Sequence, residues 1–566
     1  MCRFVLTMGS ILTAALLWTP GFASAQTGTP TTTYDIEAGN NTSACAGTGD
    51  PAGLQGYCSG NFAGFKTNGS NTNAQTQTVD PVPGHVSSVK LIKYLYSGAT
   101  TKFIAAYQPW FCNTGASGPY NGTQTCTIAD AGYHKIVGYD ENNKVPEAGI
   151  IAAQDKLMVA EGFWAVSPDW YGTSSSKAFI NATVMAQAMD LKSRALKLLV
   201  MLDEGAITSG NSGTQYTTGC PTGGSTDQTD CLIYNLEYDL DYIESNWAEN
   251  GYYAKDSSGA NLVTFFLHES DFSANWTAVM NDVTAHIAAY PTPMKLLSEN
   301  KTFGLTGFSG AYAWPQIACS DVVNNACASW YVNNSTEGFT AAAIPTVPGD
   351  CSHGSDGCMQ FYWNQTAPPP GSTFQYLEDF YTGAAANPND VAIGGIWKGF
   401  DDHNASWGTN RVIAQQCGQV LLNSFAAINW AHTNLENGSF SLAYAQVATW
   451  NDYEEGTEVE TGVDNCYQVQ NAAYSQANDE LTWELNPVNG LSKNASEYAS
   501  LSTVHGFTIW KADASGNLTS IASPGPTVRS LKKVSTLLGS GSWTLYVEMV
   551  GMPLIINRMS SGVAYP

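Results

Sequence analysis

The chain has 566 residues, of which 48 are acidic and 23 basic, so that its formal net charge at pH 7 is −25. Such a surface repels nucleic acid and anionic membranes, and we therefore expect neither as a partner; a neutral substrate suits this charge better. Hydrophobic residues make up 43% of the chain, which is enough for a large core, and the length predicts two or three domains.

Residues 1–25 have the layout of a secretory signal peptide. Met1 to Arg3 carry one basic residue, Phe4 to Leu17 are mostly apolar or small, and Ala23-Ser24-Ala25 offers a small-residue cleavage site. The apolar run is short for a membrane span, and no later run of 18 or more apolar residues follows. We therefore expect a secreted, extracellular and soluble protein.

The cysteines agree with export. Thirteen are present, and twelve remain without Cys2; an even number in an exported chain favours disulfide bonds. Their spacing suggests short-range disulfide bonds within loops: Cys45/Cys58, Cys112/Cys126, Cys220/Cys231, Cys319/Cys327 and Cys351/Cys358. Cys417 and Cys466 are left over. A metal cluster is the alternative, but no CxxC or paired Cys/His spacing supports it, and we expect neither a metal nor a cofactor.

Residues 26–95 are rich in Gly, Asn and Thr as far as about Ser88, with little periodicity, and we interpret them as an N-terminal extension packed irregularly on the main domain.

From about Lys102 to Thr457, short apolar runs alternate with longer amphipathic segments. The apolar runs are Phe103–Trp110, Gly162–Trp170, Leu196–Asp203, Leu262–His268, Lys295–Leu297, Gly304–Phe308, Val391–Trp397 and Leu442–Trp450. The amphipathic segments include Glu147–Ala160, Ala178–Arg194, Cys231–Ala248 and Ala274–Ala289.

Continuous apolar strands that alternate with helices are typical of a parallel sheet. Eight such units predict an α/β fold, a (β/α)8 TIM barrel with enlarged loops, over residues 96–470. A doubly wound open sheet is the alternative, but no Gly-rich phosphate loop follows the first strand.

Residues 471–566 change pattern and predict a small C-terminal β-sandwich, because short β-rich runs are separated by Gly, Ser, Asn and Pro. These runs are Glu480–Glu484, Gly506–Lys511, Leu518–Ile521, Lys533–Leu537, Ser542–Val550 and Met552–Ile556. Such a domain either binds carbohydrate or buttresses the barrel, and the second role is the commoner one.

Barrel enzymes work at the C-terminal ends of their strands, and almost every predicted end carries an aromatic residue, a carboxylate or both. Candidate substrate-binding residues at these ends are Tyr107, Trp110, Asp169, Trp170, Tyr171, Asp203, His268, Trp397, Asp401, Trp450 and Tyr453. Aromatic rings can stack on sugars and carboxylates can accept bonds from hydroxyl groups, so the pattern favours a cleft for a neutral polyhydroxyl chain. The alternative for each residue is structural, as a cap on the barrel core or on a helix.

The end of the last strand, Trp450-Asn-Asp-Tyr-Glu-Glu-Gly-Thr457, is the most specific motif. Glycoside hydrolysis needs one carboxyl group to protonate the leaving oxygen and another to activate the attacking group. A tight turn can point Asp452 and Glu455 into the barrel mouth together. A nearby carboxylate, or burial against Trp450 or Tyr453, would keep one of them protonated. Glu454 is the alternative acid if this register is displaced by one residue.

The motif Trp450-Asn451-Asp452-Tyr453-x-Glu455 resembles the closing-strand motif of glycoside hydrolase family 71, the endo-acting α-1,3-glucanases. Its extension to Glu460 is also similar to the matching motif of family 99, the endo-α-mannosidases and endo-α-mannanases. Residues 106–111, His134 with residues 137–139, and residues 169–172 are similar to the opening strands of family-99-like proteins. On its residue type alone, His134 is more often structural. The resemblance implies a (β/α)8 barrel, an acidic catalytic pair and a substrate-binding role for His134.

This chain departs from both families. At position 452 this chain has Asp, as family 71 does, whereas family 99 has Glu. After the Tyr, family 71 usually has Gly-Glu-Ser, whereas this chain has Glu454-Glu455-Gly456. Thr461 stands where a Pro is common in family 99. Resemblance to family 99 implies that Asp452 assists the 2-hydroxyl of the sugar as nucleophile, whereas resemblance to family 71 implies inverting attack by water. In both, Glu455 is the better candidate for the acid.

We therefore expect a secreted, monomeric, endo-acting glycoside hydrolase that cleaves an α-linked neutral polysaccharide of the α-1,3-glucan or α-mannan type. The first alternative is a non-catalytic secreted carbohydrate-binding protein on a barrel scaffold. The second is an exported hydrolase of another kind, such as a serine esterase, but residues 307–310 lack the spacing of a GxSxG elbow.

Overall fold

The structure is a computed structural model. It describes residues 33–37, 65–67, 74–78, 89–110, 135–137, 147–174, 178–208, 227–267, 269, 272–299, 303–315, 373–401, 412–413, 416–452, 455, 457–460, 462–463, 465, 467–487, 499–514 and 518–566. The predicted signal peptide, His134, His268, Tyr453 and every cysteine except Cys231 and Cys417 therefore lie outside the described residues. Cys231 and Cys417 are each disulfide-bonded, and the predicted pairing remains a prediction.

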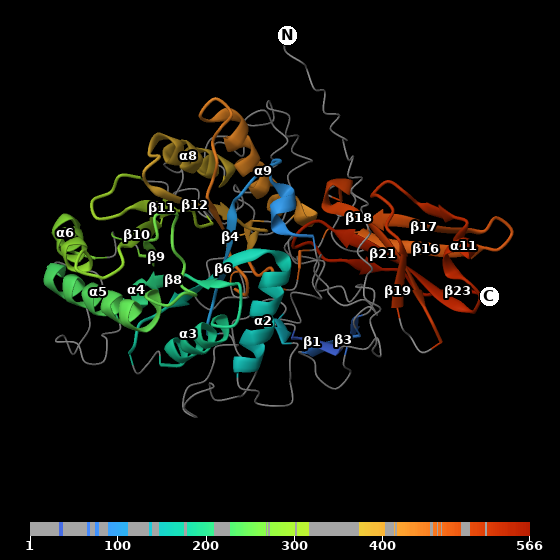
Figure 1. The fold of residues 1–566 in the computed structure, drawn as a ribbon, viewed down its shortest axis with the longest axis horizontal. Helices are drawn as coiled ribbons and strands as arrows, with labels where there is room; N and C mark the ends of the chain where they lie inside the picture. The colour runs from blue at the N-terminus through green and yellow to red at the C-terminus, as the bar shows by residue number, and fades with distance from the viewer. Residues whose placement is uncertain are drawn as a thin grey trace, which may run out of the picture.

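Eight parallel strands close a barrel, and their order around it follows the sequence (Figure 1). They are β4 (Lys102–Tyr107), β6 (Phe163–Trp170), β8 (Val200–Asp203), β9 (Asn261–Phe266), β10 (Met294–Glu299), β11 (Gly310–Tyr312), β12 (Val391–Ile396) and β15 (Tyr444–Val447). The last strand pairs with the first, with Val447 opposite Ala105, and the short β7 (Lys197–Leu198) lies beside β6. The predicted (β/α)8 barrel is confirmed.

Helices surround the barrel and follow most of its strands. They are α2 (Glu147–Glu161), α3 (Ala178–Leu191), α4 (Glu204–Thr208), α5 (Thr229–Ile243), α6 (Trp276–Ile287), α8 (Thr373–Ala386) and α9 (Gln419–Asn434). The predicted helices over α2, α3, α5 and α6 are confirmed, and α5 runs on into a π-helical turn, η3 (Glu244–Ala248). The sixth strand was predicted wrongly at Gly304–Phe308, because Gly304 and Gly307 have positive φ angles of 73° and 81° and form turns before β11.

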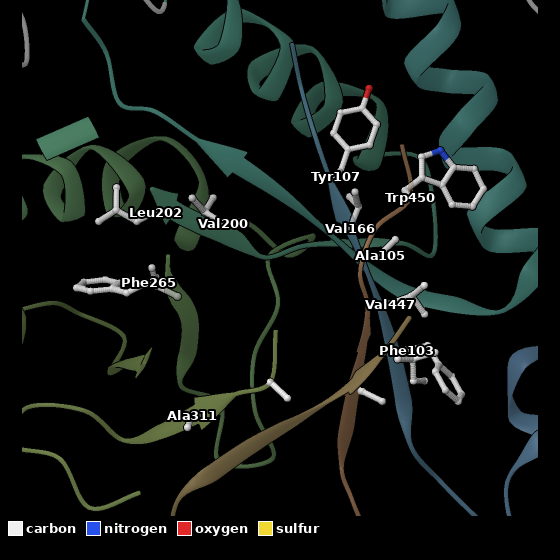
Figure 2. Packing of buried hydrophobic residues seen from close by; sticks show 14 of the residues in the cluster. Phe103, Ala105, Tyr107, Val166, Val200, Leu202, Phe265, Ala311, Val447 and Trp450 are labelled. Carbon is white, nitrogen blue, oxygen red and sulfur yellow. The ribbon is translucent and has the colours of Figure 1, made fainter. Parts of the chain in front are cut away.

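Each barrel strand buries both of its faces, which explains the continuous apolar runs. In β4, Phe103, Ala105 and Tyr107 pack in the layer between strands and helices, whereas Ile104 and Ala106 belong to the core inside the barrel. Figure 2 shows the outer layer around β4, with Val166 and Val447 from the strands on either side. Because successive side chains point to opposite faces, a shift of one residue exchanges the barrel interior for the helix-facing layer.

Residues 26–95 are more regular than predicted. A four-stranded antiparallel sheet, in the order β2-β3-β1-β5, joins this segment to residues that follow the first barrel strand. Its strands are β1 (Thr33–Glu37), β2 (Phe65–Thr67), β3 (Ala74–Thr78) and β5 (Lys135–Val137). A short 3-10 helix, η1 (Leu91–Tyr94), then leads into the barrel.

The C-terminal region contains two antiparallel sheets that share one hydrophobic core. The first sheet contains β16 (Tyr467–Ser475), β17 (Glu480–Pro487) and β20 (Ser530–Lys532), and the second contains β18 (Val504–Ala512), β19 (Leu518–Ala522), β21 (Trp543–Gly551), β22 (Arg558–Met559) and β23 (Val563–Tyr565). Two predicted strands were wrong: Lys533–Leu537 is mostly the helix α11 (Val534–Leu538), and Met552–Ile556 is largely a turn.

The two sheets lie at one end of the molecule, away from α5 and α6 (Figure 1), and backbone hydrogen bonds connect them to the barrel. The N–H of Val463 donates to the carbonyl of Leu554 at 2.7 Å, and the N–H of Ile556 donates to the carbonyl of Val463 at 3.0 Å. Leu554 and Ile555 pack in the outer core of the barrel, which makes the segment after β15 a fixed junction. Within the described part of the chain, no helix is long and apolar enough to cross a membrane.

Candidate active site

The site begins at the seam where β15 meets β4. The N–H of Gln108 donates to Oδ1 of Asn451 at 2.7 Å, and Nδ2 of Asn451 donates to the carbonyl of Gln108 at 2.9 Å. The N–H of Trp450 also donates to the carbonyl of Ala106 at 2.6 Å. These bonds continue the pairing of the first and last strands beyond their ends, and fix the backbone that carries the next residue, Asp452.

Asp452 is held in a tight turn and is only 4% exposed. Its N–H donates to Oγ1 of Thr449 at 2.8 Å, and its carbonyl accepts the N–H of Thr457 at 3.1 Å. The carboxylate accepts two donors, the N–H of Glu455 at 3.1 Å and Nε2 of Gln108 at 3.2 Å. Asp452 thus has a defined orientation, and Glu455 follows on the same turn with its side chain half-buried.

Two further carboxyl groups reach this region from neighbouring strands. Asp169 near the end of β6 and Asp203 at the end of β8 are both 3% exposed, and their side chains hydrogen-bond to each other. Burial raises the pKa of Asp169 well above its usual range, and the charges of Asp203, Asp452 and Glu455 raise it further. Burial and these charges thus favour the protonated form of Asp169, and four carboxyl groups share one electrostatic environment at this rim of the barrel.

Tyr171 and Trp110 lie beside these carboxyl groups. Burial raises the pKa of Tyr171, and the negative charges of Asp169, Asp203 and Asp452 raise it further. The rings of Tyr171 and Trp110 meet edge to face, with their centroids 5.5 Å apart. Gly205 makes this packing possible, because a Cβ atom at that position would collide with the ring of Tyr171 and would lie 2.8 Å from Oδ1 of Asp203.

Four predicted substrate-binding aromatics are core residues instead. Tyr107, Trp170, Trp397 and Trp450 are at most 4% exposed and pack in the outer layer of the barrel, and Figure 2 shows Tyr107 and Trp450 there. Nε1 of Trp170 donates to Oδ1 of Asn181 in α3 at 3.0 Å. Their burial favours the structural alternative, and their predicted contact with substrate stays a prediction.

The remaining predicted residues divide into two groups. Asp169, Asp203 and Tyr171 share one electrostatic environment with Asp452, and the ring of Trp110 contacts that of Tyr171. Asp401 lies in the short hairpin of β13 (Phe400–Asp401) and β14 (Val412–Ile413) after β12, and only its backbone is described. His134, His268 and Tyr453 lie outside the described residues, so their roles remain predictions.

Sequence reasoning missed the residues that fix the segment after Asp452. Nζ of Lys398, just beyond β12, lies 2.8 Å from Oε1 of Glu458, and both side chains are fully buried. On the other side, Oε1 of Glu460 accepts Nε2 of Gln154 at 2.9 Å. The sequence Thr-Glu-Val-Glu of residues 457–460 carries no signal that separates the surroundings of these two glutamates.

No protein-family model matches the sequence, and a search of curated proteins also finds no match. Two structures of a GH99 endo-alpha-mannosidase from Bacteroides thetaiotaomicron are similar. The first is 14% identical, with a TM-score of 0.38, and the match covers 63% of this chain and 86% of that protein. The second is 11% identical, with a TM-score of 0.36, and the match covers 70% of this chain and 94% of that protein. A glycoside hydrolase family 5 protein from Bacteroides vulgatus shows 9% identity and a TM-score of 0.30 over 71% of this chain and 86% of its own. These values are low, so the residues of this chain have to support any assignment of function.

Proposed function

We propose that this protein is a secreted glycoside hydrolase that cleaves internal bonds of an α-linked neutral polysaccharide, with Asp452 and Glu455 as its catalytic pair. The observation that supports this most is the convergence of carboxyl groups from β6, β8 and the end of β15, where burial raises the pKa of one of them, Asp169. The carboxyl groups lie at the C-terminal ends of parallel barrel strands, where barrel enzymes place their active sites.

The surroundings of the two residues suit different tasks. Asp452 is buried and accepts two hydrogen bonds, an arrangement that stabilises a charged carboxylate able to take a proton from the attacking hydroxyl group or water. Glu455 is half-buried, so its side chain can reach a bound substrate. In this proposal Glu455 protonates the leaving oxygen as the glycosidic C–O bond breaks, and the attacking oxygen takes its place on the sugar.

The other groups provide contacts for a neutral sugar chain. The carboxyls of Asp169 and Asp203 can accept or donate hydrogen bonds to sugar hydroxyls, and the partly buried ring of Trp110 offers a surface for stacking. The α-linkage and the glucan or mannan type are supported by the motif from Trp450 to Glu460 alone. Export is supported by the signal-like residues 1–25 and by the disulfide-bonded Cys231 and Cys417.

The test is a reducing-end assay of the purified protein on α-1,3-glucan, α-1,4-glucan, yeast α-mannan and β-linked glucans. The proposal expects new reducing ends from one α-polysaccharide, with oligosaccharides of mixed length as early products because the enzyme is endo-acting. Cleavage of a β-linked glucan alone would contradict the proposed linkage. Saturable glycan binding without any release of reducing ends would favour the carbohydrate-binding alternative.

A further inference from the structure

Gln108 lies directly after β4 and contacts Asp452 of the proposed catalytic pair with one end of its amide. Its Nε2 donates to Oδ2 of Asp452 at 3.2 Å, and its side chain is buried, at 3% exposed. Its Oε1 is also buried, and it has no hydrogen-bond partner among the residues that the structure describes. One end of this amide is thus hydrogen-bonded, and the other end is buried without a partner in the described part of the chain.

The orientation of this amide follows from chemistry. If the amide were turned by 180°, Oε1 would face a carboxylate oxygen of Asp452, and two acceptors would oppose each other. The backbone cannot turn away either, because Asn451 binds both the N–H and the carbonyl of Gln108. Oε1 is therefore held beside Asp452 as a buried acceptor that requires a donor.

We propose that Gln108 has two roles at the active site: its Nε2 positions Asp452, and its Oε1 accepts a hydrogen bond from a hydroxyl group of the sugar bound next to Asp452. This inference rests on the proposed hydrolase function and names a residue that sets specificity within it. The ligand must present a donor at this point, as a free sugar hydroxyl does. A sugar that is methylated or deoxygenated there leaves Oε1 unpaired and is disfavoured.

The experiment compares two variants of Gln108 with a matched control elsewhere in the barrel. Gln108→Met removes both ends of the amide at nearly constant size, whereas Gln108→Glu keeps an acceptor and replaces the donor. The control is Gln187→Met in α3, because Nε2 of Gln187 donates to Oδ1 of Asp155 at 3.1 Å, its Oε1 also lacks a partner among the described residues, and it is fully buried. Gln187 therefore reproduces the local chemistry of Gln108 outside the site.

Gln108→Met is expected to lower kcat/KM by about 10- to 100-fold, the usual range for a hydrogen bond to a charged group. Loss of positioning lowers kcat, and loss of the hydroxyl contact raises KM. The acidic limb of the profile of kcat/KM against pH moves to higher pH, because Asp452 loses a donor to its charged form. Gln108→Glu moves the profile to lower pH. At low pH a protonated Glu can donate a hydrogen bond to ionised Asp452, and at higher pH an ionised Glu repels the charge of Asp452.

Wild-type protein, the two Gln108 variants and Gln187→Met are assayed in parallel, and thermal unfolding reports whether each is folded. If Gln108→Met does not fold, the profile of Gln108→Glu decides. Three results would overturn the inference while wild-type activity still supports the hydrolase. They are an unchanged pH profile in folded Gln108 variants, an unchanged KM in Gln108→Met, and the same kinetic change in Gln187→Met. An inactive wild-type protein would instead overturn the proposed function, and this inference with it.

Discussion

The ammonium group of Lys398 lies 2.8 Å from the carboxylate of Glu458, and neither side chain is more than 1% exposed. Lys398 follows β12, and Glu458 belongs to the segment just after Asp452 and Glu455. Burial lowers the pKa of Lys398, and the charge of Glu458 opposes that change. This ion pair therefore connects the segment that carries the proposed catalytic residues to the neighbouring strand, inside the protein.

Lys398→Met is expected to destabilise the barrel by about 3–5 kcal/mol, because it leaves the charge of Glu458 buried without a partner. Activity should fall as well, since the turn that holds Asp452 loses its attachment to β12. Thermal unfolding and kcat/KM measure the two effects. The double variant Lys398→Met/Glu458→Met removes both charges and should regain much of the lost stability. A single variant that unfolds at the wild-type temperature would contradict this account.

Gly205→Ala is expected to reduce activity without unfolding the protein. The added Cβ collides with the ring of Tyr171 and approaches Oδ1 of Asp203, which also accepts the N–H of Gly205 at 2.6 Å. Both side chains must shift, and a misplacement of about 1 Å near reacting groups can cost on the order of 100-fold in rate. Gly251→Ala is the matched control, since a Cβ there meets nothing within 4 Å. Equal activity of the two variants would refute the proposed role of this packing.

Trp110 and Trp170 are expected to separate binding from stability. Trp110 is partly buried beside Tyr171, so Trp110→Ala should raise KM and leave the unfolding temperature close to that of the wild type. Trp170→Phe leaves Oδ1 of Asn181 without its donor and should cost about 1–3 kcal/mol of stability, with little change in KM. Steady-state kinetics and thermal unfolding of both variants test this division, and a KM effect confined to Trp170→Phe would reverse it.

Two buried glutamates each contribute stability that is expected to be lost as the pH rises. Burial raises the pKa of Glu161 at the end of α2 from 4.5 to about 8, although Lys90 opposes the shift, and it raises that of Glu548 in β21 to about 7. A raised pKa means that the unfolded chain ionises first. The stability that each glutamate contributes is therefore complete below pH 4.5 and is lost progressively up to about pH 8 for Glu161 and about pH 7 for Glu548.

Glu161→Gln and Glu548→Gln should each remove part of this fall, by an amount on the order of a few kcal/mol. The measurement is the unfolding temperature at pH 5 and pH 8 for the wild type and for each variant. Glu161 reports on the barrel and Glu548 on the C-terminal sheets, so each variant should alter the transition of its own region. Variants that lose as much stability between these pH values as the wild type would contradict the assignment.

The barrel was predictable because its strands bury both faces. That requirement leaves apolar runs such as those of β4 and β6, which alternate with helices along the chain. Apolar composition alone does not separate a strand from a buried turn, however. Residues 304–308 have the composition of a strand, but their two glycines adopt positive φ angles and place β11 two residues further on, at Gly310. Similarly, Lys533 has a φ angle of 59° and begins a helix where a strand was predicted.

The candidate site was predictable only in part, for a related reason. Asp169 and Trp170 are neighbours at the end of β6, but alternation sends Asp169 into the barrel and Trp170 towards the helices. Both were predicted to contact substrate, since strand ends alone do not distinguish the two faces. The contact of Gln108 with Asp452 joins residues 344 positions apart and depends on how the barrel closes, which local sequence does not show.

The most direct test of the central claim is the rate of polysaccharide cleavage by Asp452→Asn and Glu455→Gln. Asp282→Asn serves as the control, because Asp282 is an exposed carboxylate on α6. On the polysaccharide that the wild-type protein cleaves, the two site variants should lose about 100- to 10,000-fold in kcat, the range expected for loss of general acid–base catalysis, while remaining folded. Asp282→Asn should match the wild type. Folded Asp452→Asn or Glu455→Gln with the wild-type rate would contradict the assignment of these two residues as the catalytic pair.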